Sequence, residues 1–336
     1  MTAIEITYLN GADVEALALS DAEILEAVGG VLAAQGRGET VIEPRTHLFP
    51  RPDRDRSAGH FNVLRGATRE LAGVKVVGDF VSNHLRGLPS ELALLLLMDP
   101  DTGVPRAIID ATAITEMRTG AVTAIGAERL ARSDARSLGH IGARGTAYWN
   151  VRLLCRVLPE LDQIRVHSRR PESRAEFART LSRDLGRDIR AVDSWEECVR
   201  DADVLVEASR LTDPAPLLRT EWVKPGALVI PYGTVSAVEL SLTEIMDKIV
   251  VDDWSQAGVG PLGALRAHVD SGRLTEANLH GELGEIVAGL KPGRERADET
   301  ILLWHRGLSS TDIALGQALL TKAAQRGVGA RLPYRC

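Results

Sequence analysis

The chain has 336 residues, of which 44% are hydrophobic and 26% are charged, and its formal net charge is −6. This length allows two domains, and the negative net charge argues against a general nucleic-acid binder and against attraction to an anionic membrane surface. Three widely separated cysteines, apolar runs too short to span a bilayer and an N-terminus without a visible secretory signal predict a cytoplasmic protein.

The N-terminal third predicts a helix followed by a set of strands. A strand-like run leads to Asn10, a plausible N-cap for a helix over 13–34, where apolar residues recur at helical spacing. Residues 39–110 have the pattern of strands separated by turns. Two of these strands, 92–98 and 106–110, are joined by the turn sequence DPDTGVP and predict a hairpin.

The pattern changes after residue 110. An alanine-rich helix is predicted over 111–132, and beyond it short apolar strands alternate with helices, which is typical of parallel βαβ units. The strands are predicted at 137–141, 163–169, 188–192, 203–209, 224–233 and 248–254. The helices are predicted at 146–157, 173–184, 195–202, 279–290 and 312–326.

The stretch SLGHIGARGTA, at 137–147, joins a predicted strand to a helix and contains three glycines. Glycine lets the backbone turn tightly and approach a phosphate, and the amides at the start of the next helix attract an anion. If the dinucleotide fingerprint G-x-G-x-x-G/A starts at Gly142, Arg144 occupies the position of its middle glycine. The alternative is a tight strand-to-helix turn without a ligand. The predicted cofactor-binding residues of this turn are Gly142, Ala143, Arg144, Gly145 and Thr146.

The end of the following strand bears on the type of cofactor. An enzyme that prefers NAD usually has an acidic residue there, which binds the ribose 2′-hydroxyl. This chain has Ser168, Arg169 and Arg170 instead, and two guanidiniums suit a 2′-phosphate. We therefore predict that NADP(H) is favoured over NAD(H), against the alternative of two solvated arginines.

Three cations stand in separate predicted elements of the N-terminal part. Lys75 interrupts an apolar strand, where an unpaired ammonium would be costly to bury, and Arg118 interrupts a helix of small and apolar residues. With Arg45, which lies in a strand, they could converge on a carboxylate. Taken singly, each could be a surface residue whose stem packs on apolar neighbours, and the residues alone leave both interpretations open.

Several motifs in this order resemble the ornithine cyclodeaminase and mu-crystallin family. The resemblance extends over nearly the whole chain. It is clearest in the sequences GVKVVGDFVSNHLRGLP (73–89), LLLLMDPDTGVPRAIIDATAITEMRTGAVTAIGAERLAR (94–132), LGHIGARGTA (138–147), GEIVAGLKPGR (284–294) and RGLSSTDIA (306–314).

The resemblance implies a fold, an assembly and a chemistry. It implies a Rossmann-type doubly wound α/β domain at 119–314, and an α+β dimerisation and substrate-binding domain formed by 1–118 with 315–336. It implies a homodimer that uses NAD(P)(H) on amino acids and imines. By the same resemblance, Arg45, Lys75 and Arg118 would hold the substrate carboxylate near the nicotinamide, and Lys75 would also move a proton. We further assign Thr119 and Ser209 to the predicted cofactor site.

The chain also departs from the family pattern. The family commonly has G-A-G-x-Q-A at the glycine turn, where this chain has Arg144 and Thr146. Ornithine cyclodeaminases carry an aspartate in the loop after the KPG strand, whereas this chain reads YGTVSA at 232–237 and has no acid before Glu239. The segment HFNVLRG, at 60–66, lacks the glutamate of such enzymes. A substrate with fewer positive charges than ornithine is therefore favoured.

These observations predict an NAD(P)(H)-dependent oxidoreductase of the ketimine reductase or amino-acid dehydrogenase type, with an α-amino or α-imino acid as its small-molecule substrate and no metal. One alternative is an ornithine cyclodeaminase-type ammonia lyase. Another is a non-catalytic nucleotide-binding protein like mu-crystallin.

Overall fold

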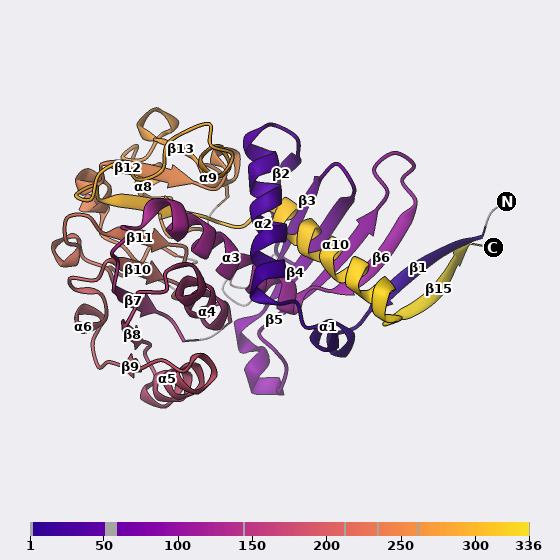
Figure 1. The fold of residues 1–336 in the computed structure, drawn as a ribbon, viewed down its shortest axis with the longest axis horizontal. Helices are drawn as coiled ribbons and strands as arrows, with labels where there is room; N and C mark the ends of the chain where they lie inside the picture. Colours follow the sequence, from indigo (N-terminus) through magenta and orange to yellow (C-terminus); the bar gives the residue numbers. More distant parts are fainter. Residues whose placement is uncertain are drawn as a thin grey trace. The chain divides into compact units, whose positions relative to one another are not determined.

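The computed structural model describes residues 3–50, 59–143, 145–211, 213–233, 235–260 and 262–335. The chain divides into two compact units (Figure 1): unit 1 is Met1–Arg118 with Gly307–Cys336, and unit 2 is Thr119–Arg306.

The chain passes between the two units at two boundaries, one inside a helix and one just before a helix. The first boundary lies inside helix α3 (Thr112–Leu130). The second lies at Gly307, earlier than the predicted boundary after Ala314. The reason is that helix α10 (Ser309–Arg326) is continuous and packs on the sheet of unit 1.

Unit 1 is built on a seven-stranded sheet. Its strands are β1 (Ile4–Leu9), β2 (Val41–Leu48), β3 (His60–Ala67), β4 (Ala72–Asp79), β5 (Glu91–Met98), β6 (Pro105–Asp110) and β15 (Ala330–Arg335). Their spatial order is β15-β1-β6-β5-β4-β3-β2, and only the β1–β6 pair is parallel. The predicted hairpin is confirmed by the antiparallel pairing of β5 with β6, whereas β15 was not predicted.

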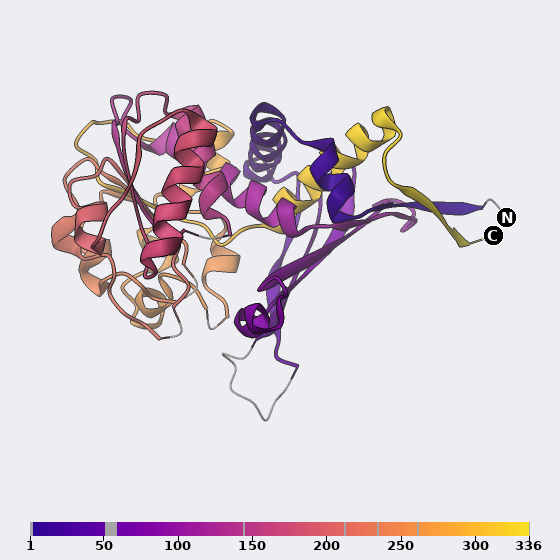
Figure 2. The ribbon, with the colours of Figure 1, turned by 90° about the horizontal axis from the view of Figure 1, so that it is seen from below.

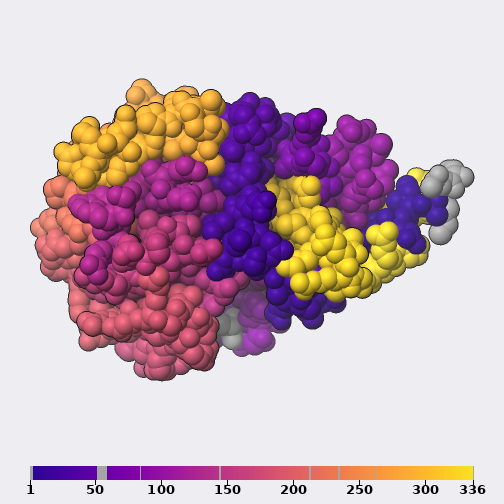
Figure 3. Space-filling view, viewed as in Figure 1, coloured from indigo at the N-terminus to yellow at the C-terminus, as the bar shows by residue number. Residues whose placement is uncertain are grey.

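Helix α10 (Ser309–Arg326) covers one face of this sheet. Helix α10 packs against α2 (Asp21–Gly36) and against β3, β4 and β5 (Figure 2), and α10 and α2 lie side by side at the surface in Figure 3. The single helix predicted over 13–34 is wrong, because the chain turns at Ala18, where φ is 46°. Asn10 caps α1 (Gly11–Leu17) and Ser20 caps α2, each with a capping box that favours a separate helix start. A 3-10 helix, η2 (Val81–Arg86), connects β4 to β5.

Unit 2 contains an eight-stranded, fully parallel sheet. Its strands are β7 (Ser137–Ile141), β8 (Gln163–His167), β9 (Ile189–Ala191), β10 (Val204–Glu207), β11 (Leu228–Pro231), β12 (Lys248–Val251), β13 (Gly281–Glu282) and β14 (Ile301–Trp304). The spatial order is β13-β12-β14-β11-β10-β7-β8-β9. The chain therefore runs outward from β7 to β9 and then restarts at β10 on the other side of β7.

This reversal of strand order confirms the predicted Rossmann-type fold. In open α/β sheets, ligands bind beyond the carboxyl ends of the strands at such a reversal. The relevant strand ends here are those of β7 and β10, which pair directly, with Ile141 opposite Glu207.

The helices of unit 2 connect its strands. Besides the later part of α3, they are α4 (Ala147–Val157), α5 (Pro171–Leu185), α6 (Trp195–Val199), α7 (Trp254–Ala257), α8 (Arg266–Asp270) and α9 (Leu283–Val287), with 3-10 helices η3 (Thr220–Trp222), η4 (Leu240–Ile245) and η5 (Glu276–Asn278). The helix predicted over 279–290 is reduced to α9, because Gly281 and Glu282 pair with β12 as a strand. In the described part of the chain, no helix is both long and apolar enough to cross a membrane.

Candidate functional site

A buried ion-pair cluster in unit 1 joins β4, α3 and α10. Strand β4 alternates between a buried and a half-buried face, and Lys75 belongs to the buried one. The Lys75 Nζ atom donates to Asp312 Oδ1 at 2.6 Å and to Thr115 Oγ1 at 3.1 Å. The Arg118 Nε atom donates to the same Asp312 oxygen at 3.1 Å. Asp312 is fully buried, and its Oδ2 atom has no hydrogen-bond partner among the described residues.

Compared with water, the protein environment of Lys75 stabilises the neutral amine relative to the ammonium. Burial lowers the pKa of Lys75 from its ordinary 10.5 to about 8. The Asp312 carboxylate opposes this shift, and the Arg118 guanidinium adds to it. An amine with this pKa exchanges protons near neutral pH, which suits a general acid or base.

Arg45 reaches the same cluster through the backbone of Gly307. The Arg45 Nη2 atom donates to the Gly307 carbonyl oxygen at 2.7 Å. Gly307 has a φ of +84°, and a Cβ atom at this position would collide with the Arg118 guanidinium. The structure thus brings the three predicted cations together, around Asp312 and Gly307.

The glycine turn in unit 2 connects β7 to α4. The Gly142 amide donates to the His167 carbonyl at 2.9 Å, and φ of Gly142 is +115°. A Cβ atom on Gly142 would lie 2.9 Å from the Ala208 carbonyl oxygen, so the residue must stay small for the turn to pass the end of β10. Ala143 is half-buried and Gly145 is exposed, which leaves this part of the turn open to a ligand. Arg144 lies outside the described residues.

Two polar side chains at the end of β10 are buried with unsatisfied atoms. The Ser209 amide donates to Glu207 Oε1 at 2.7 Å. Neither Glu207 Oε2 nor Ser209 Oγ has a hydrogen-bond partner within the part of the chain that the structure describes. Burial raises the pKa of Glu207 from 4.5 to about 7. Unsatisfied polar groups at the reversal of strand order fit a ligand that carries hydroxyl groups, such as the riboses of a dinucleotide.

The other predicted cofactor residues lie in two places. Ser168 is half-buried after β8, and Arg169 and Arg170 are exposed before α5. No acidic residue follows β8 in this segment, as the sequence indicated. Thr119 is buried in α3, directly after Arg118.

Sequence reasoning gave no role to Asp312 or Glu207. Asp312 ends the polar run SSTD at 309–312, which opens α10 and is buried throughout. Glu207 ends the otherwise apolar strand VLVE, in which every residue is buried. A carboxylate inside a segment whose pattern predicts burial is the signal that could have identified both residues.

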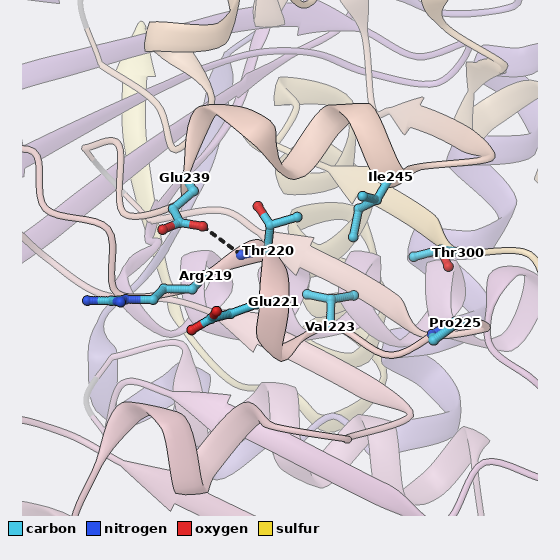
Figure 4. A pocket seen from close by; sticks show the side chains of 8 residues that line it. All are labelled: Arg219, Thr220, Glu221, Val223, Pro225, Glu239, Ile245 and Thr300. Carbon is cyan, nitrogen blue, oxygen red and sulfur yellow. Dashed lines mark hydrogen bonds between the residues drawn. The ribbon is translucent and has the colours of Figure 1, made fainter.

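A cavity of about 570 Å³ in unit 2 lies at the other end of the sheet (Figure 4). Two of its lining residues, Pro225 and Thr300, precede β11 and β14, so the cavity is at the amino ends of these strands. At one side of it the Thr220 amide donates to Glu239 Oε2 at 2.9 Å. The cavity is therefore separate from the glycine turn.

The chain is similar to known proteins along nearly its whole length. Residues 5–326 match the model of the ornithine cyclodeaminase/mu-crystallin family. An alanine dehydrogenase of Archaeoglobus fulgidus is 30% identical, over 98% of this chain and 99% of that protein. Among solved structures, the Δ1-pyrroline-2-carboxylate reductase of Thermococcus litoralis, in complex with NADH and L-proline, is 29% identical with a TM-score of 0.88, over 97% of this chain and 99% of that one. An archaeal alanine dehydrogenase dimer with bound NAD is 29% identical with a TM-score of 0.89, over 99% of this chain and 100% of that one. The chain belongs to the ornithine cyclodeaminase/mu-crystallin family.

Proposed function

We propose that the protein is a nicotinamide-dinucleotide-dependent oxidoreductase that interconverts an α-imino acid and an α-amino acid. The observation that carries this proposal is the cluster in which Lys75 and Arg118 bind the Asp312 carboxylate and Arg45 binds the Gly307 carbonyl oxygen. With Lys75 protonated, the three positive charges exceed the negative charges of Asp312, which contacts two of them, and of Glu91, which also acts on Lys75, so the cluster favours a further anion. A substrate carboxylate is that anion in the proposed reaction.

The residues of the cluster have different roles in this proposal. Arg45 and Arg118 bind the substrate carboxylate, because a guanidinium offers parallel donors that match two carboxylate oxygens. Lys75 donates a proton to the substrate during reduction and accepts one during oxidation. Asp312 is a positioning residue that fixes the Lys75 ammonium and the Arg118 guanidinium through one oxygen. A bound reduced nicotinamide supplies the hydride for the C=N carbon.

Unit 2 supplies the proposed dinucleotide site. The residues fit such a ligand: Gly142 allows close approach of the backbone, α4 begins directly after the turn, and Glu207 and Ser209 offer unsatisfied polar atoms. The solved pyrroline-2-carboxylate reductase and alanine dehydrogenase, each 29% identical to this chain, hold NADH and NAD, which supports a nicotinamide cofactor here.

A binding and turnover experiment tests the proposal. NADH and NADPH are titrated into the purified chain by fluorescence, and oxidation of the bound nucleotide is then followed with two sets of substrates. The first is a panel of α-keto acids with ammonia, and the second is the cyclic imino acid Δ1-pyrroline-2-carboxylate. Failure to bind either nucleotide contradicts the proposal. Release of ammonia from ornithine or lysine with catalytic NAD+ would instead identify a cyclodeaminase.

The cofactor preference is a separate prediction. The exposed guanidiniums of Arg169 and Arg170 favour a 2′-phosphate, although the solved relatives hold NADH and NAD. We expect NADPH to bind more tightly than NADH, and Arg169→Ala to weaken NADPH about tenfold, because a charge-assisted contact to the phosphate is lost. Arg179→Ala, which removes an exposed arginine of α5, is the matched control. Equal dissociation constants for the two nucleotides would contradict this preference.

The sheet of unit 1 also supports a homodimer. On the face opposite Lys75, Tyr8, Leu92 and Leu94 are 37%, 46% and 43% exposed. Leu96 pairs with Ile108, and Ile108 pairs with Tyr8, so these side chains share that face with the two exposed leucines. Contiguous apolar surface of this kind marks a protein interface, and an archaeal relative is described as a dimer. We propose that a second copy of the chain covers this face.

The proposed dimer predicts the effect of one substitution. We expect twice the chain mass of 36.3 kDa for the unaltered protein, and the single chain mass for Leu94→Lys, because an ammonium would be buried without a partner. Light scattering after size exclusion measures both masses. Leu290→Lys, at a leucine that is 61% exposed in unit 2, should keep the mass of the unaltered protein. A monomeric unaltered chain is the result that would exclude the proposed interface.

A further inference from the structure

Tyr232 connects the loop after β11 to the beginning of α4. Its hydroxyl oxygen lies 2.7 Å from Thr146 Oγ1, and it also accepts a short hydrogen bond from Asn150 Nδ2. Asn150 is fully buried, and its Nδ2 atom lies 3.4 Å from Nε2 of His140, which is fully buried in β7. Burial lowers the pKa of His140 to about 4, so this imidazole is neutral at physiological pH. One hydroxyl group therefore contacts two residues of the helix that follows the glycine turn.

The ring of Tyr232 is held from the other side. It stacks on the His305 ring, with centroids 4.8 Å apart and planes at 27°. The Nε2 atom of His305 lies 2.9 Å from Thr123 Oγ1 in α3, and His305 is 1% exposed. All of these residues belong to unit 2. The position of the hydroxyl is thus fixed by packing as well as by hydrogen bonds.

Thr146 differs from Ser20 and Ser194, the serines at the N-caps of α2 and α6. Ser194 caps α6 by accepting from the Glu197 amide at 3.0 Å, with an extended backbone at ψ 157°. Thr146 stands at the N-cap of α4, but its backbone is helical, with φ −65° and ψ −14°, and its side chain makes no capping hydrogen bond. Its hydroxyl contacts Tyr232 instead. The side chain that would ordinarily satisfy the first amides of α4 is therefore turned away from them.

We propose that Tyr232 is a positioning residue for the dinucleotide, which keeps the Thr146 hydroxyl from capping α4. The amides at the N-terminus of α4 then stay available to the pyrophosphate. This inference rests on the proposed function, because it requires a dinucleotide at the glycine turn. Without the Tyr232 hydroxyl, Thr146 takes the extended backbone of an ordinary N-cap and competes with the phosphate for the same amides.

A double-mutant cycle measures this competition. The dissociation constant of NADH is determined by fluorescence titration for the unaltered protein, Tyr232→Phe, Thr146→Val and the double variant. Tyr232→Phe should raise the dissociation constant about fivefold, which is the size of a typical N-cap contribution. The same substitution should have no effect in the Thr146→Val background, because no hydroxyl remains to compete. Tyr334→Phe is the matched control, since Tyr334 is 59% exposed on β15 in unit 1.

Two results would overturn the inference: an unchanged dissociation constant for Tyr232→Phe, or an equal loss of affinity in both backgrounds. Hydrogen exchange on the unaltered protein gives a test that does not depend on the folding of any variant. The amides of Tyr148 and Trp149 should exchange rapidly without NADH and become protected when NADH binds. Protection that is already complete without NADH contradicts the inference. If the unaltered chain binds neither NADH nor NADPH, the proposed function itself fails.

Discussion

Lys75→Met is expected to lower kcat/KM for imino-acid reduction by at least about 100-fold, which is the lower end of what a positioned acid or base contributes. Methionine keeps the volume and the apolar stem of the side chain but has no ammonium to orient the substrate or donate a proton. The dissociation constant of NADH should stay the same, because the dinucleotide is proposed to bind unit 2. Steady-state kinetics together with the fluorescence titration separate the two effects.

The pH dependence of the reaction tests whether the Lys75 ammonium is the proton donor. Since the pKa of Lys75 is lowered to about 8, kcat/KM for reduction should fall as the pH rises through 8, where the ammonium loses its proton. In the oxidative direction the neutral amine is the active form, so kcat/KM should rise through the same pH. Both transitions should be absent in Lys75→Met.

A matched lysine provides the control for this substitution. Lys322 lies later in α10 than Asp312. Its Nζ atom forms an ion pair with Glu23 Oε2 at 2.8 Å in unit 1. Lys322→Met removes an ion pair without removing a proposed catalytic group, so its kcat/KM and pH profile should match those of the unaltered protein. Activity of Lys75→Met within tenfold of normal, with the ionisation near pH 8 intact, would falsify the role of Lys75.

Glu207→Gln is expected to remove a pH-dependent loss of stability. The pKa of Glu207 is raised to about 7 in the folded protein, from an ordinary 4.5, because the carboxylate is buried. Between these two values the unfolded chain has released the proton while the folded chain still holds it. The free energy of unfolding therefore falls as the pH rises from 4.5 to 7, by up to about 3 kcal/mol. Glutamine stays neutral, so the variant does not undergo this fall.

Chemical denaturation of both proteins at pH 5 and pH 7.5 measures the difference. Relative to the unaltered protein, Glu207→Gln should gain stability at the higher pH. The neutral His140 has the opposite pH dependence, with its pKa lowered to about 4, but its contribution is the same in both proteins and cancels. Glu160→Gln, at an exposed position after α4, is the matched control. A stability difference for Glu207→Gln that does not vary with pH would contradict an uncharged buried carboxyl.

Local patterns predicted much of the fold. The alternation in β4 and β5, the turn between β5 and β6 and the alternating strands and helices after residue 132 all depend on neighbours in the sequence. The same local signals contained the break between α1 and α2, where Ser20 and Glu23 form a capping box, but the apolar spacing across 13–34 concealed it. Strand β15 could not be predicted, because its pairing with β1 joins the two ends of the chain.

The parallel α/β unit, the glycine turn and the three cations can be recognised from local patterns, because periodicity and residue type are local properties. The way in which those cations are paired depends on long-range contacts. Lys75 and Asp312 are far apart in the chain, and their contact at 2.6 Å exists because α10 returns to pack on the sheet that carries Lys75. The contact of Tyr232 with Thr146 likewise requires the ends of β7 and β11 to meet the start of α4. Such distances are set by long-range packing, and the spacing of residues along the sequence does not predict them.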